Sequence, residues 1–275
     1  MSVKSNIFDE FYYSNVCFGS EEYKKSKGLK LNPKVEKIID DLRLTRKMDV
    51  LEIACGRGDT SLYIAKKVKT VIGIDYSEDA IKIANNIKSL SKKKIKDKLT
   101  FLTMKANRLK FKTGSFNMII LIDALDHLNK NEVNQTFLEM LRVLKPGGTI
   151  FIKTCANKIL LNKTYRYYIL PLNKFLTTID KVIKGTNYKS LPDSSRTVEA
   201  KIQHVNEVDY FYLNSLFRKY DLQGKIWGEV GFLTQNNGLR SKIYNFLVTL
   251  NPLSQYFPLN IFFAHSFFAL MHKKT

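Results

Sequence analysis

Two carboxylates of this 275-residue chain stand where they could hold a nucleotide. Glu52 lies in the apolar run Val50–Ile53, which leads through Gly56 and Gly58 into a helical pattern, and Asp75 ends the next apolar run. Glycines allow a ligand to approach the backbone closely, and an acid at the second strand end accepts both hydroxyls of a ribose. The pattern predicts a nucleotide-binding strand, loop and helix.

The glycine loop alone is also compatible with a dinucleotide-binding dehydrogenase. That fingerprint needs a third glycine three positions after the second, and Ser61 stands there. The stretch from Glu52 to Thr60, an acid followed by small residues and Gly-x-Gly, resembles motif I of the class I S-adenosylmethionine (AdoMet) dependent methyltransferases. We expect Asp59 or Thr60 to cap the helix that follows the loop.

The surrounding pattern predicts the elements that position these residues. Apolar runs predict seven strands, at Asp49–Ile53, Thr70–Asp75, Leu99–Met104, the run ending at Ile122, Thr149–Thr154, Leu222–Trp227 and Ser266–Met271. Four helices are expected. The first starts at Pro33 with Asn32 as its cap, and the second follows the cap Ser77. The third starts at Asn131, with Phe137, Leu138, Leu141 and Leu144 facing the sheet, and the fourth covers Val208–Tyr220. Lys145–Gly148 should end the third helix, and this Lys-Pro-Gly-Gly turn is also typical of the methyltransferases.

The fold class implied is α/β, a Rossmann-like doubly wound seven-stranded sheet, mostly parallel with the last strand antiparallel, and helices on both faces. Residues 1–31 form an expected N-terminal lid or extension, and residues 32–275 the methyltransferase domain. The connection after the fifth strand, at about 155–203, is far longer than the usual two to six residues. It carries Tyr165, Arg166, Tyr167, Tyr168, Phe175 and Tyr188, so it is expected to build the acceptor site or, alternatively, to close the sheet edge.

The resemblance implies roles for the residues around the AdoMet cofactor. Glu52 would hold the ammonium group, Asp75 the ribose, and Tyr76 would pack on the adenine face. Lys105 stands where the family usually has the aspartate that recognises adenine, so the backbone amide of Ala106 and the side chain of Asn107 are expected to replace it. The methionine portion is expected against Ala54, Gly56, Gly58 and Ile122.

Methyl transfer requires alignment of donor and acceptor and, for some acceptors, removal of a proton. His127 and His204 are the histidines placed near predicted strand ends, so they are the candidate general bases. Each has a structural alternative, a loop-to-helix junction for His127 and a helix-entry hydrogen bond for His204. The three cysteines lack the spacing of a metal site or a disulfide framework, and no metal is expected.

The formal charge of +20 indicates attraction to nucleic acid, anionic lipid or an acidic substrate. The alternative is that lysine simply occupies every solvated surface, without a specific partner. No signal-peptide core and no run of about eighteen apolar residues is present, which favours a cytoplasmic protein. Residues Ile243–Met271 contain no Asp, Glu, Lys or Arg. A helix and a buried strand account for this stretch, and peripheral contact with an anionic membrane is the alternative.

Two sequence features that the chain lacks make two classes of methyl acceptor unfavourable. The loop after the fourth strand has no Asn/Asp-Pro-Pro-aromatic sequence, which is typical of methyltransferases acting on exocyclic amino groups, and Cys155 is misplaced for a cytosine-C5 nucleophile. We therefore expect an AdoMet-dependent methyltransferase acting on a small-molecule or lipid-like acceptor. The alternatives are an RNA methyltransferase that uses the basic surface and a methyltransferase-like binding protein without turnover.

Overall fold

The computed structural model describes residue 3 and residues 7–155, 157–184, 191–196, 202–230 and 239–273. Seven strands form one sheet in the order β3-β2-β1-β4-β5-β7-β6. Their bounds are β1 Asp49–Ile53, β2 Thr70–Asp75, β3 Leu99–Thr103, β4 Phe116–Ile122, β5 Leu144–Cys155, β6 Leu222–Glu229 and β7 Ser266–Lys273. Each predicted strand is therefore present, with ends that differ by a few residues.

The strand directions confirm the predicted fold class. β1 pairs in parallel with β2 and β4, β2 with β3, and β4 with β5. β7 runs antiparallel to both β5 and β6, as expected for the last strand. Because β1, β2, β4 and β5 are parallel, their carboxyl ends meet at one edge of the sheet, where α/β proteins bind ligands.

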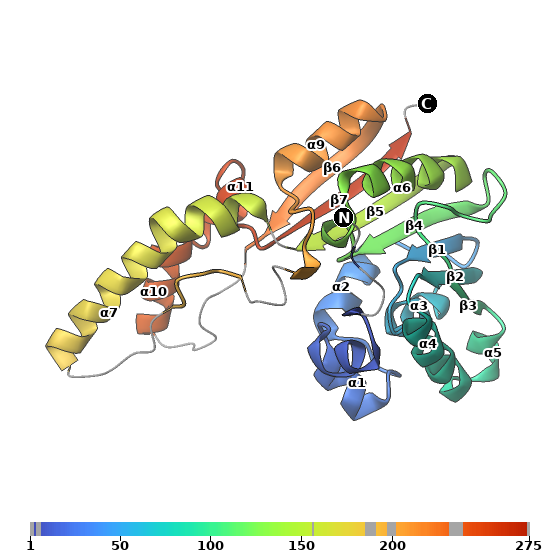
Figure 1. The fold of residues 1–275 in the computed structure, drawn as a ribbon, viewed down its shortest axis with the longest axis horizontal. Coiled ribbons are helices and arrows are strands. Elements are labelled where there is room, and N and C mark those ends of the chain that lie inside the picture. The colour runs from blue at the N-terminus through green and yellow to red at the C-terminus, as the bar shows by residue number, and fades with distance from the viewer. Residues whose placement is uncertain are drawn as a thin grey trace.

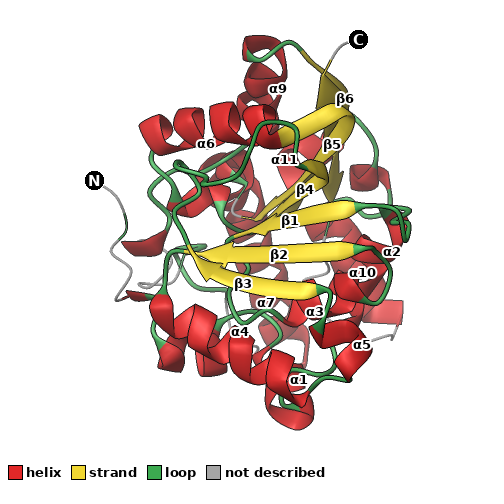
Figure 2. Cartoon of the chain, turned by 90° about the vertical axis from the view of Figure 1, so that its right-hand side faces the viewer, coloured by secondary structure: helices red, strands yellow, loops and turns green. Residues whose placement is uncertain are grey.

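Helices cover both faces of the sheet (Figure 2). One core joins the sheet to α6 (Lys130–Val143) and α9 (Tyr210–Lys219), and a second core joins it to α2 (Pro33–Asp41), α3 (Asp59–Ala65) and α4 (Glu78–Leu90). The other described α-helices are α1 (Ser20–Ser26), α5 (Lys93–Lys96), α7 (Leu170–Lys184), α10 (Leu239–Thr249) and α11 (Leu259–Phe263). The central strands are buried on both sides, which explains their nearly continuous apolar sequences.

Two of the three predicted helix caps, Asn32 and Ser77, are present in the structure. The side chain of Asn32 accepts from the N–H of Lys34 (3.0 Å), and that of Ser77 from the N–H of Ala80 (3.2 Å). The prediction that Asp59 or Thr60 caps α3 is wrong. The N-cap is Gly58, whose φ of +80° suits glycine, and a Cβ there would lie 2.5 Å from the ring of Phe101.

Helix α6 differs in phase from the prediction. A capping box between Asn129 and Glu132 starts it at Lys130, just before the predicted Asn131. Val133, Phe137 and Met140 are buried, whereas Leu138, expected to face the sheet, is 58% exposed. Spacings of four and three residues from Val133 place Phe137 and Met140 on the buried side, whereas Leu138 lies about 100° around the helix from Phe137. The Lys145–Gly148 segment lies within the bounds of β5.

The long connection after β5 forms a helical extension of the domain. A π-helix (Leu160–Ile169) leads directly into α7, and α7 lies beside α10 (Figure 1). Leu160, Ile169 and Val248 are buried between them as a separate small core. The uncharged Ile243–Met271 stretch comprises the end of α10, the 3₁₀ turn Leu253–Gln255, α11 and most of β7. None of the described helices has the length and apolarity needed to cross a membrane.

Candidate functional site

A cavity of about 820 Å³ opens at the carboxyl edge of the parallel strands. All residues predicted for the site except Gly58 line this cavity: Glu52, Ala54, Gly56, Asp75, Tyr76, Ala106, Asn107, Ile122, His127 and His204. Gly58 instead turns the chain into α3 against Phe101 and Ala84. The fold thus gathers residues that are up to 152 positions apart, from Glu52 to His204, into one site.

Asp75 joins the end of β2 to the glycine loop. One carboxylate oxygen accepts from the N–H of Gly56 and the other from the N–H of Ser77, both at 2.9 Å. Burial raises the pKa of Asp75, and the backbone donors at Ser77 and Gly56 oppose that rise. Each carboxylate oxygen can accept a further hydrogen bond. Asp75 therefore fixes the loop and still offers acceptors to a ligand in the cavity.

Glu52 is buried beneath the same loop, and its carboxylate accepts a short hydrogen bond from the hydroxyl of Ser61. Burial raises the pKa of Glu52 to about 8, although the bond from Ser61 opposes the shift. Ser61 occupies the position at which a dinucleotide fingerprint has its third glycine. Its hydroxyl thus has a structural task that a glycine could not perform.

The buried Glu52 predicts a stability that depends on pH. Its folded-state pKa of about 8 lies above the usual 4.5, so the folded state binds the extra proton between these values. The free energy of unfolding should therefore fall as the pH rises from 4.5 to 8, by at most about 1.4 kcal/mol per pH unit. In urea unfolding, Glu52→Gln should remove the contribution of Glu52 and so make this slope less steep, while Glu78→Gln at an exposed position should retain the full slope. Equal slopes in wild type and Glu52→Gln would contradict the assignment.

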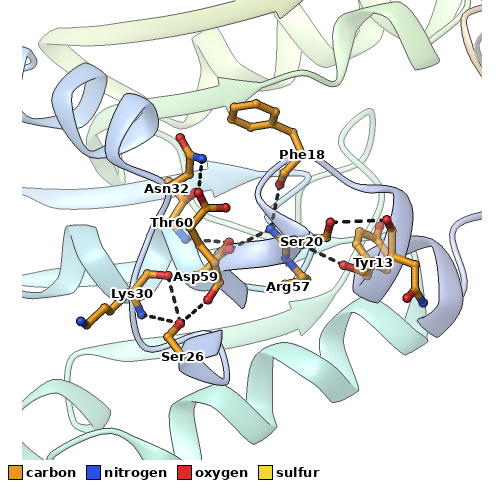
Figure 3. A network of polar contacts seen from close by, with 11 residues as sticks. Tyr13, Phe18, Ser20, Ser26, Lys30, Asn32, Arg57, Asp59 and Thr60 are labelled. Atoms are coloured by element: carbon orange, nitrogen blue, oxygen red, sulfur yellow. Dashed lines mark hydrogen bonds and ion pairs between the residues drawn. The ribbon is translucent and has the colours of Figure 1, made fainter. Parts of the chain in front are cut away.

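Arg57, which is only 4% exposed, binds the N-terminal segment over the glycine loop. Its guanidinium donates to the carbonyls of Tyr13 (2.8 Å) and Phe18 (2.9 Å) and pairs with Asp59 (2.9 Å; Figure 3). The Tyr13 ring lies so close to Gly56 that a Cβ there would be 3.1 Å from it. Sequence reasoning missed Arg57, although an arginine between two loop glycines is a recognisable signal.

A cluster of Asp126, His127 and His204 lines the cavity beside the end of β4. Potential ligand atoms of the three side chains all lie within 4.8 Å of one another. Asp126 is fully buried, and neither of its carboxylate oxygens accepts a hydrogen bond from the part of the chain that the structure describes. The Nε2 atom of His204 lies 3.1 Å from Asp126, within ion-pair distance but without hydrogen-bond geometry. A buried carboxylate without donors is costly, which makes it a candidate for binding a cation.

The two histidines differ in what they can do. The Nδ1 atom of His127 lies 3.0 Å from the carbonyl of Gln203. Because a carbonyl only accepts, Nδ1 carries the proton in neutral His127 and Nε2 keeps a lone pair. The Nδ1 atom of His204 is buried with no described partner, and burial lowers the pKa of His204 although Asp126 opposes this. His127 is thus the better-placed base, and both histidines oppose the rise that burial causes in the pKa of Asp126.

Two further groups escaped sequence reasoning. Asp123, at the end of β4, pairs with Lys153 of β5 at 2.5 Å, so its carboxylate is already neutralised. Burial lowers the pKa of Lys153, but Asp123 raises it further, and the net shift is upward. Tyr12 lines the cavity, and burial together with Asp126 and Asp123 raises its pKa. The isolated lysine in the apolar β5 sequence was the available signal for the ion pair.

Asn107, expected near the adenine, lies at the cavity wall, whereas most of the described part of the long insert does not line the cavity. The amide nitrogen of Asn107 donates to Gln135 (3.2 Å), a bond that leaves its amide oxygen as the group able to accept from adenine. Among the described residues of the insert, only Cys155 and Gln203 line the cavity. The insert aromatics of the described part therefore do not build the cavity wall, contrary to expectation, because α7 and the π-helix before it project from the sheet. Tyr188 lies outside the described residues.

Comparisons of sequence and of structure both find methyltransferases that are similar to this chain. Residues 50–148 match the family model described as "Methyltransferase domain". The chain is 27% identical to phosphoethanolamine N-methyltransferase of Plasmodium falciparum, covering 81% of each chain. It is 30% identical to norajmaline N-methyltransferase of Rauvolfia serpentina, covering 40% of this chain and 37% of the relative. The structure superposes on Haemonchus contortus phosphoethanolamine N-methyltransferase 1 with a TM-score of 0.58 and 13% identity, covering 98% of this chain and 49% of the other.

Proposed function

Because the chain belongs to the class I AdoMet-dependent methyltransferase superfamily, we propose that it transfers a methyl group from AdoMet to a small-molecule or lipid-like acceptor whose reacting atom is an amine nitrogen. The observation that carries the choice of an amine is the buried, undonated carboxylate of Asp126 beside His127. The N-methyltransferases among the relatives support the same choice.

The residues of the cavity fit AdoMet. Gly56, with a φ of +50°, exposes its backbone at the cavity wall, and the volume of about 820 Å³ is within the range of about 300–1,000 Å³ usual for ligand sites. Asp75 would hold the ribose hydroxyls, and Asn107 would accept from the adenine amino group. The ammonium group of AdoMet would favour the ionised form of Glu52, and the carboxylate would hold it directly or through water. When bound, AdoMet supplies a methyl group activated by a sulfonium.

The acceptor would be held by Asp126. An amine enters largely as an ammonium ion at neutral pH, and burial raises the pKa of Asp126 while the neighbouring histidines lower it. An incoming ammonium would further favour the carboxylate and satisfy its missing donors. This places a positively charged acceptor group at the end of β4, next to His127.

His127 would then prepare the nucleophile. An ammonium has no lone pair, so it must lose a proton before its nitrogen can attack the methyl carbon. The free Nε2 of His127 accepts this proton while Nδ1–H stays bonded to the Gln203 carbonyl. The carbonyl fixes the ring orientation and stabilises the imidazolium that forms. Phe8 is buried with its ring edge-on to the ring of His127, at 5.1 Å between centroids, and this contact also limits the ring orientation.

Asp126→Asn tests the acceptor site. The substitution keeps the shape but removes the negative charge, so we expect kcat/KM for the amine to fall by about 100-fold, mainly through KM, with AdoMet affinity unchanged. Asp123→Asn, at a carboxylate already paired with Lys153, should retain the acceptor KM. Unchanged kcat/KM in Asp126→Asn would exclude the proposed role. The three side chains also form a donor set suited to a divalent cation, so the assay is repeated with EDTA, which should not alter the activity.

The proposed function is tested by incubating the protein with methyl-labelled AdoMet and separated lipid, RNA and small-molecule fractions of its native cell. We expect label in amines of the small-molecule or lipid fraction. Label confined to RNA would replace the acceptor class with RNA. Binding of AdoMet without label in any fraction would indicate a binding protein that does not turn over.

A further inference from the structure

The helix pair formed by α7 and α10 leaves large apolar side chains exposed. We call the following residues the apolar flank: Phe175, Ile179, Val182 and Ile183 of α7, and Ile243 and Phe246 of α10. Val182 is 81% exposed and Ile183 71%. Exposed patches of this kind are uncommon on monomeric soluble proteins and mark interaction sites.

Helical spacing separates the apolar flank from the core of the helix pair. Phe175, Ile179 and Val182 recur at four and three residues, which places them on one side of α7. The inward side is occupied by Leu172 and Leu176, which pack in the small core around Val248. The two helices are also joined by a hydrogen bond from Asn173 to the hydroxyl of Tyr244 (2.5 Å). The helix pair therefore has its own core and, in addition, exposed apolar side chains on both helices.

The charge around the apolar flank is strongly positive. Segments 157–184 and 239–263 together contain eight basic residues and a single acidic residue, and one of the eight, Lys174, pairs with Asp193 of the neighbouring segment. Lys163, Lys181 and Lys242 are exposed on these segments. Apolar side chains bordered by lysine suit the interface of an anionic bilayer, where the apolar groups enter the acyl boundary and the lysines contact headgroups.

We propose that the apolar flank docks the protein on an anionic membrane surface, lying in the interface without crossing the bilayer. Figure 1 shows α7 and α10 extending away from the sheet, and the chain reaches them from Cys155, a cavity residue at the end of β5. A second copy of the chain is a less suitable occupant, because two equally basic surfaces would repel each other.

Vesicle sedimentation tests the docking surface without cofactor or acceptor, so its outcome is independent of the proposed methyl transfer. Wild type should sediment with phosphatidylcholine vesicles that contain phosphatidylglycerol and much less with phosphatidylcholine alone. The double substitution Val182→Gln and Ile183→Gln should weaken binding by about tenfold or more. Both side chains are largely exposed, so the fold should be retained. Leu138→Gln, at a residue of α6 that is 58% exposed, is the matched control and should bind like wild type.

Three results would overturn the proposal. The first is equal sedimentation of wild type and the double variant, and the second is no sedimentation of wild type with either vesicle. The third is a wild-type dimer, seen by light scattering without vesicles, that becomes a monomer in the double variant, which would make the apolar flank a contact between copies. Methyl transfer to a water-soluble acceptor should be unchanged in the double variant, so a loss of docking is distinguishable from a loss of catalysis.

Discussion

Asp75→Asn is expected to weaken AdoMet binding by about 100-fold or more. The wild-type carboxylate would accept from two ribose hydroxyls while it also accepts from the N–H groups of Gly56 and Ser77. Hydrogen bonds to a charged acceptor contribute roughly 1.5–3 kcal/mol each, and a loss of about 3 kcal/mol corresponds to a factor of about 100. Equilibrium dialysis with labelled S-adenosylhomocysteine measures the change.

The control for this variant must separate binding from folding. An asparagine amide would place its NH₂ group against one of the two backbone N–H groups, so thermal unfolding of Asp75→Asn is measured in parallel. Asp79→Asn removes a surface carboxylate that pairs with Lys82 on α4, and it should bind like wild type. A folded Asp75→Asn protein with wild-type affinity would show that Asp75 does not hold the ribose.

His127→Gln is expected to lower kcat by about 10²–10⁴, the usual range for loss of a general base. Glutamine can still donate to the carbonyl of Gln203, but it cannot take up a proton. AdoMet affinity should remain unchanged, because the cofactor contacts proposed above come from other residues. Single-turnover methyl transfer to the amine acceptor measures the chemical step directly.

The matched control is His272→Gln, an exposed histidine near the end of β7. It should leave kcat unchanged. A His127→Gln enzyme with wild-type kcat would assign proton removal to solvent or to another group.

The sheet was predictable because its strands are encoded locally. Buried parallel strands such as Thr70–Asp75 read as continuous apolar runs, and their ends carry Asp75 and the glycine loop. The phase of α6 was less predictable. Leu138 satisfies the apolar pattern, but it lies about 100° around the helix from Phe137, and only the packing of the helix on the sheet decides which of the two is buried.

The candidate site was predictable only where its residues belong to the local motif. Glu52, Gly56 and Asp75 could be assigned from spacing along the chain. The role of Asp126 could not be assigned from spacing, because its burial and its lack of hydrogen-bond donors arise only when the segment carrying His204 folds against it. Arg57 similarly gains its role from the carbonyls of Tyr13 and Phe18, more than 35 positions earlier in the chain.

The insert after β5 shows the limit of compositional reasoning. Its aromatic residues were expected at the acceptor site, yet Tyr168 packs on Phe263 and donates to the carbonyl of Leu247. These partners come from the C-terminal part of the chain, and nothing in the insert sequence specifies them. The same packing leaves Phe175 and Val182 at the surface, where they become part of the apolar flank.

Calorimetric titration of the purified wild-type protein with AdoMet, followed by addition of an amine acceptor, tests the central claim most directly. We predict saturable binding at one site per chain, and then release of S-adenosylhomocysteine in equal amount to the N-methylated amine. Absence of binding heat together with absence of S-adenosylhomocysteine formation would contradict the assignment of this cavity as a methyltransferase site.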